Sequence, residues 1–232
     1  MFFRKHSLWL PRWYVVLALS ALIVFSLLYT VKHTARWLAV SKPLSEAQLL
    51  VVEGWLGELL LLEALEEFRS GHYQQMVTTG GPELSRYRPE YASYAEQAAA
   101  FLLDQGLDET QITALPAPAS AQNRTYLSAV ILRNWLDEQA TDSTTINIFT
   151  ADVHAMRTRR LFEMALAGKH QLGIIAAKPE GFSLSAWWQT SEGAKTVLGE
   201  VVGNLWVSCC FNPGEPGSHY EMWAVEPSRN ID

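Results

Sequence analysis

The hydrophobic pattern begins with an uncharged apolar run close to the amino terminus. Trp13 to Val31 comprises 19 residues without a charge. An α-helix of that length spans roughly 28 Å, close to the hydrocarbon thickness of a bilayer. A cleaved signal peptide has a shorter apolar segment and a small-residue cleavage site, and no such site follows here. The pattern predicts a basic tail over 1–12 and an uncleaved, single-pass transmembrane helix over 13–31.

Beyond a juxtamembrane linker over 32–47, short apolar runs alternate with helical patterns. The expected strands are 49–52, 76–79, 112–115, 146–150 and 172–176, and the expected helices are 56–70, 90–105, 125–138, 153–167 and 191–207. Strands that alternate with helices favour right-handed βαβ units on a parallel sheet. We therefore expect an α/β domain over 48–210 with a mainly parallel sheet of about five strands, and a C-terminal tail over 211–232.

The charges are unevenly distributed along the chain. Residues 1–42 contain six basic residues and no acidic one, and the remainder, with 12 basic and 24 acidic residues, carries a net charge of −12. Because phosphate neutralisation supplies most of the affinity for nucleic acids, this balance excludes nucleic acid as a partner. The basic end suits anionic lipid headgroups, so the expected partner is a membrane bilayer. The basic residues on the two sides of the apolar run balance, and charge alone leaves the orientation open.

The cysteines and histidines restrict the chemistry further. Cys209 and Cys210 are adjacent, which excludes a disulfide framework and a zinc ribbon. In an oxidising compartment they would stay reduced, be buried or form a vicinal bridge, and we expect burial on the last helix. His72 and His170 have no metal-ligand spacing, so no metal site is predicted.

Parallel sheets bind ligands at the carboxyl ends of their strands. This rule selects the loops 53–57, 79–86, 116–124 and 150–157. The motifs of P-loop NTPases, serine hydrolases and zincins are absent from them, which removes support for those classes.

Residues of these loops form a candidate anion-binding site. Gly80-Gly81 allows backbone amides to approach an anion closely, although a glycine pair is usually only a turn. Arg124-Thr125 begins one expected helix, and Arg157 lies in the first turns of the next. Helix N-termini favour anions, and basic side chains strengthen that preference.

The candidate for proton transfer is His154, because imidazole titrates near neutral pH. Glu53, at the end of the first strand, or Glu96, in an alanine-rich helix, could orient this histidine or activate water. Each residue also has a structural alternative: His154 as a core histidine, Glu53 as a helix cap and Glu96 as a solvated or paired side chain. We expect Arg159 to pair with Glu163 on the surface, at i+4.

Five segments, in this order, resemble the SanA/ElyC/YdcF family of bacterial envelope proteins: LLVVEGWLG at 49–57, TTGGPE at 78–83, YASYAEQAA at 91–99, RTYLSA at 124–129 and TADVHAMRTRRLF at 150–162. The resemblance covers roughly residues 48–207. It implies a Rossmann-like three-layer sandwich, anchored in the bacterial inner membrane and facing the periplasm. Relatives are associated with peptidoglycan or polysaccharide assembly and lipid-carrier metabolism, and one soluble relative is thought to bind S-adenosylmethionine.

Together, these observations predict a membrane-anchored envelope-biogenesis protein that acts on or binds a phosphate-bearing precursor, such as a lipid-carrier-linked glycan. The residues do not identify a cofactor. The alternatives are a non-catalytic nucleotide- or S-adenosylmethionine-type binding module and a structural scaffold. A catalytic site predicts His154 hydrogen-bonded to a carboxylate beside an open anion pocket. A binding module predicts an apolar slot at the first two loops without that pair, and a scaffold predicts neither.

Overall fold

The computed structural model describes residues 11–82, 91–120, 123–139, 143–218 and 221, and predictions for other positions, including most of both tails, lie outside the described residues. In chain order its elements are α1 (Trp13–Leu38), β1 (Leu49–Glu53), α2 (Glu58–Ser70), β2 (Gln75–Gly80), α3 (Tyr94–Asp104), β3 (Ile112–Pro116), α4 (Arg124–Glu138), β4 (Thr145–Thr150), α5 (Ala155–Leu166), β5 (Gln171–Ala176) and α6 (Ser191–Cys209). Short 3-10 turns occupy Glu109–Gln111, Asp152–His154 and Trp187–Gln189.

The five strands form one parallel sheet in the order β3-β2-β1-β4-β5. This arrangement confirms the predicted Rossmann-like α/β class, and each strand lies within one residue of its predicted ends. The chain moves outward from β1 to β3 and then returns to β4 beside β1, so the strand order reverses between these two central strands. Such a switch point leaves a ligand-binding crevice at the carboxyl ends of the strands.

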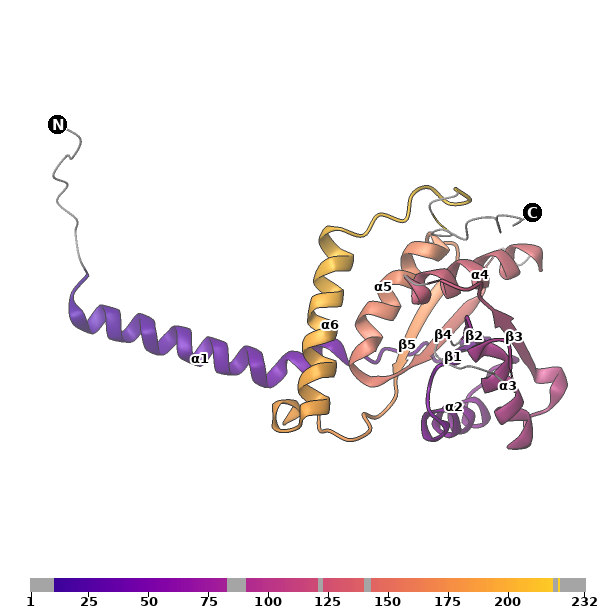
Figure 1. Ribbon diagram of the computed structural model, residues 1–232, viewed down its shortest axis with the longest axis horizontal. Helices are drawn as coiled ribbons and strands as arrows, with labels where there is room; N and C mark the ends of the chain where they lie inside the picture. Colours follow the sequence, from indigo (N-terminus) through magenta and orange to yellow (C-terminus); the bar gives the residue numbers. More distant parts are fainter. Residues whose placement is uncertain (1–10, 83–90, 121–122, 140–142, 219–220, 222–232) are drawn as a thin grey trace, which may run out of the picture.

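Helices cover both faces of the sheet (Figure 1). Leu50 and Val52 of β1 belong to a core shared with α2 and α3, whereas Leu49 and Val51 belong to the core under α4 and α5. Because successive side chains of a strand alternate between faces, one strand of apolar residues supplies both cores. All five residues of β1 are buried, as expected for a central parallel strand.

α1 is longer than the predicted membrane span. It is long and apolar enough to cross a membrane, and it continues through the first part of the predicted linker as far as Leu38. Ala35 and Leu38 pack there in a buried cluster with Val197 of α6. The Trp187 indole donates a hydrogen bond to the Val31 carbonyl at 2.8 Å. These contacts fix the end of α1 to the domain.

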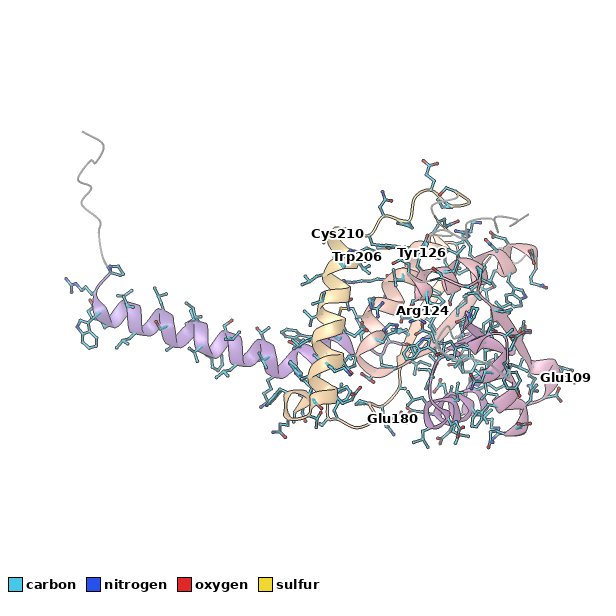
Figure 2. All side chains as sticks on the ribbon, in the orientation of Figure 1. Glu109, Arg124, Tyr126, Glu180, Trp206 and Cys210 are labelled. Atoms are coloured by element: carbon cyan, nitrogen blue, oxygen red, sulfur yellow. A yellow bond between two sulfur atoms is a disulfide. The ribbon has the colours of Figure 1, made fainter. Side chains whose placement is uncertain are left out.

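The prediction that both cysteines are buried is wrong. Cys209 and Cys210 are exposed at the C-terminal end of α6, where they form a disulfide between neighbouring residues (Figure 2). α6 buries the face that carries Val197 and Val207. Cys209 follows Val207 by two positions, which places it on the opposite face of the helix.

The segment predicted as a C-terminal tail contributes to the folded domain. Glu221 is 2% exposed and forms an ion pair with Arg133 of α4. The backbone N–H of Gly217 donates to Glu221 Oε2 at 2.6 Å. This pair therefore holds part of the segment that follows α6 against α4.

Candidate functional site

A cavity of about 1110 Å³ lies at the carboxyl ends of β1, β2 and β4, in the crevice expected at the switch point. Seven of the eight predicted site residues line it: Glu53, Gly80, Gly81, Arg124, Thr125, His154 and Arg157. One wall comes from α6, an element to which the sequence analysis assigned no site residue. The fold therefore brings residues of all four selected loops and of one distant helix around the same space.

His154 lies between the cavity and a carboxylate of α6. The turn Asp152–His154 follows β4 directly, so α5 begins at Ala155 rather than at the predicted Val153. The imidazole Nδ1 lies 2.9 Å from Glu200 Oε1. Nδ1 also lies 2.9 Å from Arg157 Nη2, so a protonated Nδ1 donates to Glu200 and an unprotonated Nδ1 accepts from Arg157. In the first of these tautomers the other nitrogen, Nε2, presents its lone pair on the other side of the ring.

The second ring nitrogen of His154 faces polar groups of two other elements. Nε2 is 3.5 Å from the Thr125 hydroxyl at the start of α4 and 3.8 Å from Glu53 Oε2 at the end of β1. Trp55 packs edge-on against the imidazole, with 5.2 Å between ring centroids. The ring is thus held between carboxylates, with one face covered by an aromatic side chain.

Glu200 is fixed by two hydrogen bonds from one arginine. Arg157 Nε donates to Oε2 and Arg157 Nη2 to Oε1, each at 2.8 Å. Burial by itself would raise the pKa of Glu200, but the hydrogen bonds from Arg157 and His154 outweigh it and hold that pKa at about 2. A Cβ at Gly203 would lie only 3.0 Å from Arg157 Nε, so glycine gives the guanidinium room beside α6. Glu200 therefore stays ionised beside the histidine.

This geometry corrects the role predicted for Arg157. The sequence analysis assigns its guanidinium to an anion, but the structure directs Nε and Nη2 to Glu200. The reason lies in the packing of α6 against α5, which brings a carboxylate from 43 positions further along the chain. Arg157 lines the cavity, and its observed partners make it a positioning residue for Glu200 and His154.

Glu53 is buried at the end of β1, with 2% of its surface exposed. Its Oε2 accepts hydrogen bonds from the hydroxyls of Thr150, on β4, and Thr158, on α5, the latter at 3.2 Å. These bonds span the switch point between the two central strands. The alternative of a helix cap does not hold, because the N-cap of α2 is Gly57, without a side-chain hydrogen bond.

The structure does not bring Glu96 to the site. Its side chain accepts a hydrogen bond from the Ser93 hydroxyl at 2.9 Å, and its backbone N–H donates back to that oxygen. The Ser93 hydroxyl is thus the N-cap of α3, and the Glu96 carboxylate is hydrogen-bonded to that cap. Glu96 is absent from the cavity lining, and the structural alternative holds for this residue.

The predicted anion-binding residues gather at the start of α4. Arg124 is exposed and forms no ion pair with any residue of the described ranges. Asn123 precedes it with a φ of 50° and gives the helix no side-chain cap, so the first N–H groups of α4 remain available. Gly80 has a φ of +146° and packs closely on Tyr94. A Cβ added to Gly80 would lie 2.9 Å from the Cβ of Tyr94. Backbone conformation and packing thus require this glycine, whether or not it binds a ligand.

The remaining charges of the cavity are acidic. Asp152, Glu180 and Glu192 add three carboxylates, and burial raises the pKa of Asp152. Figure 2 shows Arg124 towards the middle of the domain and Glu180 towards its edge. Among the described residues, no group of three or more histidine, cysteine or acidic side chains could hold a metal ion. An anion would therefore find favourable charge near Arg124, at the start of α4.

Glu200 is the site residue that the sequence analysis missed. It lies on the last helix, 46 positions from His154, and belongs to none of the four selected loops. One signal was present: Glu200 is the only charged residue between positions 196 and 209, in an otherwise apolar and glycine-containing stretch. A lone carboxylate in such a stretch has to be paired when the helix packs.

Comparison with protein-family models gives no match for this chain, and comparison with curated proteins gives none either. The functional conclusion therefore depends on the geometry of the site, and the family resemblance remains a prediction.

Proposed function

We propose that this protein is a membrane-anchored enzyme of envelope biogenesis that acts on a phosphate-bearing precursor, with His154 as its general acid–base. One observation carries the proposal: the 2.9 Å contact between His154 and Glu200, beside a cavity that also holds Arg124. A histidine paired with a carboxylate and open to a cavity is the arrangement that the sequence analysis expects of an enzyme.

The proposed chemistry assigns a role to each atom of the pair. With its proton on Nδ1, His154 accepts a proton at Nε2 from water or from a substrate hydroxyl. Glu200 is ionised and stabilises the positive charge that the ring then carries. Glu53 Oε2, 3.8 Å from Nε2, places a second carboxylate near the new proton. The imidazolium can afterwards return that proton to a leaving group.

The phosphate of the substrate is assigned to the start of α4. Arg124 supplies a guanidinium that no described carboxylate neutralises, and the uncapped start of α4 supplies N–H groups. Charge-assisted hydrogen bonds of this kind are shorter and stronger than neutral ones. The carboxylates elsewhere in the cavity disfavour an anion, which supports this one location.

The membrane part of the proposal depends on α1 and on the family resemblance. α1 is apolar enough to cross a membrane, and we assign the domain to the periplasmic side of the bacterial inner membrane. Reporter fusions at the C-terminus test the orientation. We expect an active periplasmic reporter and a silent cytoplasmic one, and the reverse pattern would contradict the assignment.

The substitution His154→Gln tests the catalytic assignment. We expect a folded, membrane-inserted protein at normal abundance whose activity is lower by about 10²–10⁴-fold, the usual contribution of a general acid–base. The measurement is the smallest induced amount of protein that restores growth or envelope integrity to a strain lacking the gene. His72→Gln, which changes an exposed histidine, is the matched control and should complement fully.

A non-catalytic binding module is the second candidate, favoured by the apolar part of the cavity wall. Trp55, Leu60 and Pro82 line the cavity near the ends of β1 and β2, where a nucleotide- or S-adenosylmethionine-type ligand would place its base. If His154→Gln complements as well as the unchanged protein at equal abundance, the catalytic assignment is wrong and this candidate takes its place.

A further inference from the structure

α6 exposes an apolar face that the rest of the domain does not cover. Four large apolar side chains form this face: Leu198, Val202, Leu205 and Trp206, which are 56, 66, 63 and 43% exposed. By the same measure α2 exposes two large apolar side chains, α3 and α5 one each, and α4 none. We refer to these four residues as the apolar face of α6.

The position of α6 identifies what covers this face. Val197 packs against Ala35 and Leu38 of α1, and Trp187, just before α6, is hydrogen-bonded to the Val31 carbonyl. In Figure 1, α6 lies across α1 where α1 meets the domain, and the other turns of α1 project away on that same side. If α1 spans a bilayer, α6 is the domain helix next to the bilayer surface.

The charges around this junction match a membrane surface. Lys32 and Arg36 are exposed on the last turns of α1, and Lys195 is exposed on α6, about one turn before Leu198, the first residue of the apolar face. The stretch from 32 to 42 contains no acidic residue, although residues 43–232 carry a net charge of −12. Basic residues beside an apolar, tryptophan-containing helical face are typical of helices that lie in the interface of anionic membranes.

We propose that α6 lies in the surface of the anionic bilayer, with its apolar face at the boundary between headgroups and acyl chains. This inference rests on the proposed anchoring by α1 and deepens the proposed function. Val202 and Trp206 belong both to the apolar face and to the cavity lining, so the membrane-facing surface continues into the cavity. A lipid substrate can then reach Arg124 with its phosphate while its chains stay in the bilayer.

Labelling of the full chain in vesicles tests this placement. In a background with Cys209→Ser and Cys210→Ser, single cysteines at Leu198 and Leu205 carry an environment-sensitive fluorophore, and neither position lines the cavity. Leu59 of α2, 70% exposed, is the matched control. The protein is reconstituted into vesicles of phosphatidylcholine and phosphatidylglycerol, with and without a lipid-attached quencher.

We expect labels at 198 and 205 to show blue-shifted emission and quenching by the lipid-attached quencher, and the label at 59 to show neither. A fourth label, at Leu22 in the middle of α1, separates the two levels of the proposal. If the label at 22 is quenched but those at 198 and 205 behave like that at 59, the placement of α6 is wrong and the anchoring stands. If the label at 22 is also unquenched, the anchoring itself is wrong.

Discussion

Two arginine–glutamate pairs in this domain, one half-buried and one buried, share their chemistry and differ in their surroundings. Arg157 donates two hydrogen bonds to Glu200, and Arg133 donates one to each oxygen of Glu221. The first pair borders the cavity and touches His154. The second contacts Tyr126, the Ala165 carbonyl and the backbone of the segment after α6.

The difference shows that the third partner decides what such a pair does. Beside an imidazole that faces a cavity, the carboxylate orients a proton-transfer group. Beside backbone groups and a buried tyrosine, the same two side chains hold a chain segment in place. The Arg133 guanidinium keeps the pKa of Glu221 below its usual range, so both carboxylates are ionised and only their neighbours distinguish them. Separate substitutions in the two pairs therefore test whether the neighbours decide the role of each carboxylate.

The largest expected effect is on stability, from the pair at the C-terminal segment. Arg133→Met leaves Glu221 buried without its counter-charge, and we expect the free energy of unfolding to fall by about 3–5 kcal/mol. Denaturant unfolding of the full chain in detergent measures it. Arg133→Met combined with Glu221→Leu should recover most of the loss, because no charge is then left unpaired. A double variant as unstable as the single one would show that the pair itself, rather than the orphaned charge, matters.

The next effect is the acid sensitivity of the cavity pair. Glu200 has a pKa of about 2 in the folded protein, against 4.5 for an unperturbed glutamate. A lowered folded-state pKa contributes stability above the unfolded value, here on the order of 3 kcal/mol, which is lost as the pH falls through the folded value. We expect the stability of the unchanged protein to decline between about pH 5 and pH 2.

Glu200→Gln should flatten that decline relative to the unchanged protein, as followed by thermal unfolding across the pH range. An acid limb with the same slope in both proteins would mean that other carboxylates cause it.

In activity, the two pairs should separate. We expect Glu200→Gln to lower activity by roughly 10- to 100-fold per folded molecule, the usual cost of losing a residue that orients a reacting group. Glu221→Gln should lower stability and leave activity per folded molecule unchanged. The activity of each variant is measured as the induced amount of protein that restores growth or envelope integrity to a strain lacking the gene. Activity retained in Glu200→Asp, together with a shifted pH dependence of activity in Glu200→Gln, would indicate a positioning role. Equal losses of activity per folded molecule in Glu200→Gln and Glu221→Gln would contradict the different roles of the two pairs.

The smallest effect concerns an arginine outside both pairs. Phosphate or pyrophosphate should raise the melting temperature of the full chain, with a stabilisation of about 1.4 kcal/mol at ten times the dissociation constant. Arg124→Gln should abolish this shift without changing the stability of the ligand-free protein. Arg159→Gln is the control: Arg159 pairs with Glu163 at 2.7 Å on the surface, as predicted, and such pairs contribute less than about 0.5 kcal/mol. Equal shifts in both variants would place the anion elsewhere.

Local patterns in the sequence were sufficient to predict the elements and the edge of the sheet where the site lies. Strand and helix periodicities are local, and each buried strand shows its pattern within five or six residues. The rule for parallel sheets then places Glu53 and His154 at one edge without any knowledge of packing. That α1 is long and apolar enough to cross a membrane was equally readable, because this depends only on length and polarity.

Which charges meet depends on long-range packing and could not be predicted from local patterns. Glu200 reaches His154 across 46 positions, and Glu221 reaches Arg133 across 88. Both contacts depend on how α6 and the segment after it pack on α4 and α5, and a helical pattern shows which face is apolar without showing the residue that it will oppose. Long-range packing also sets the rotation of α6 about its own axis. That rotation exposes Cys209 and directs Glu200 to Arg157, so neither outcome could be predicted from the local pattern.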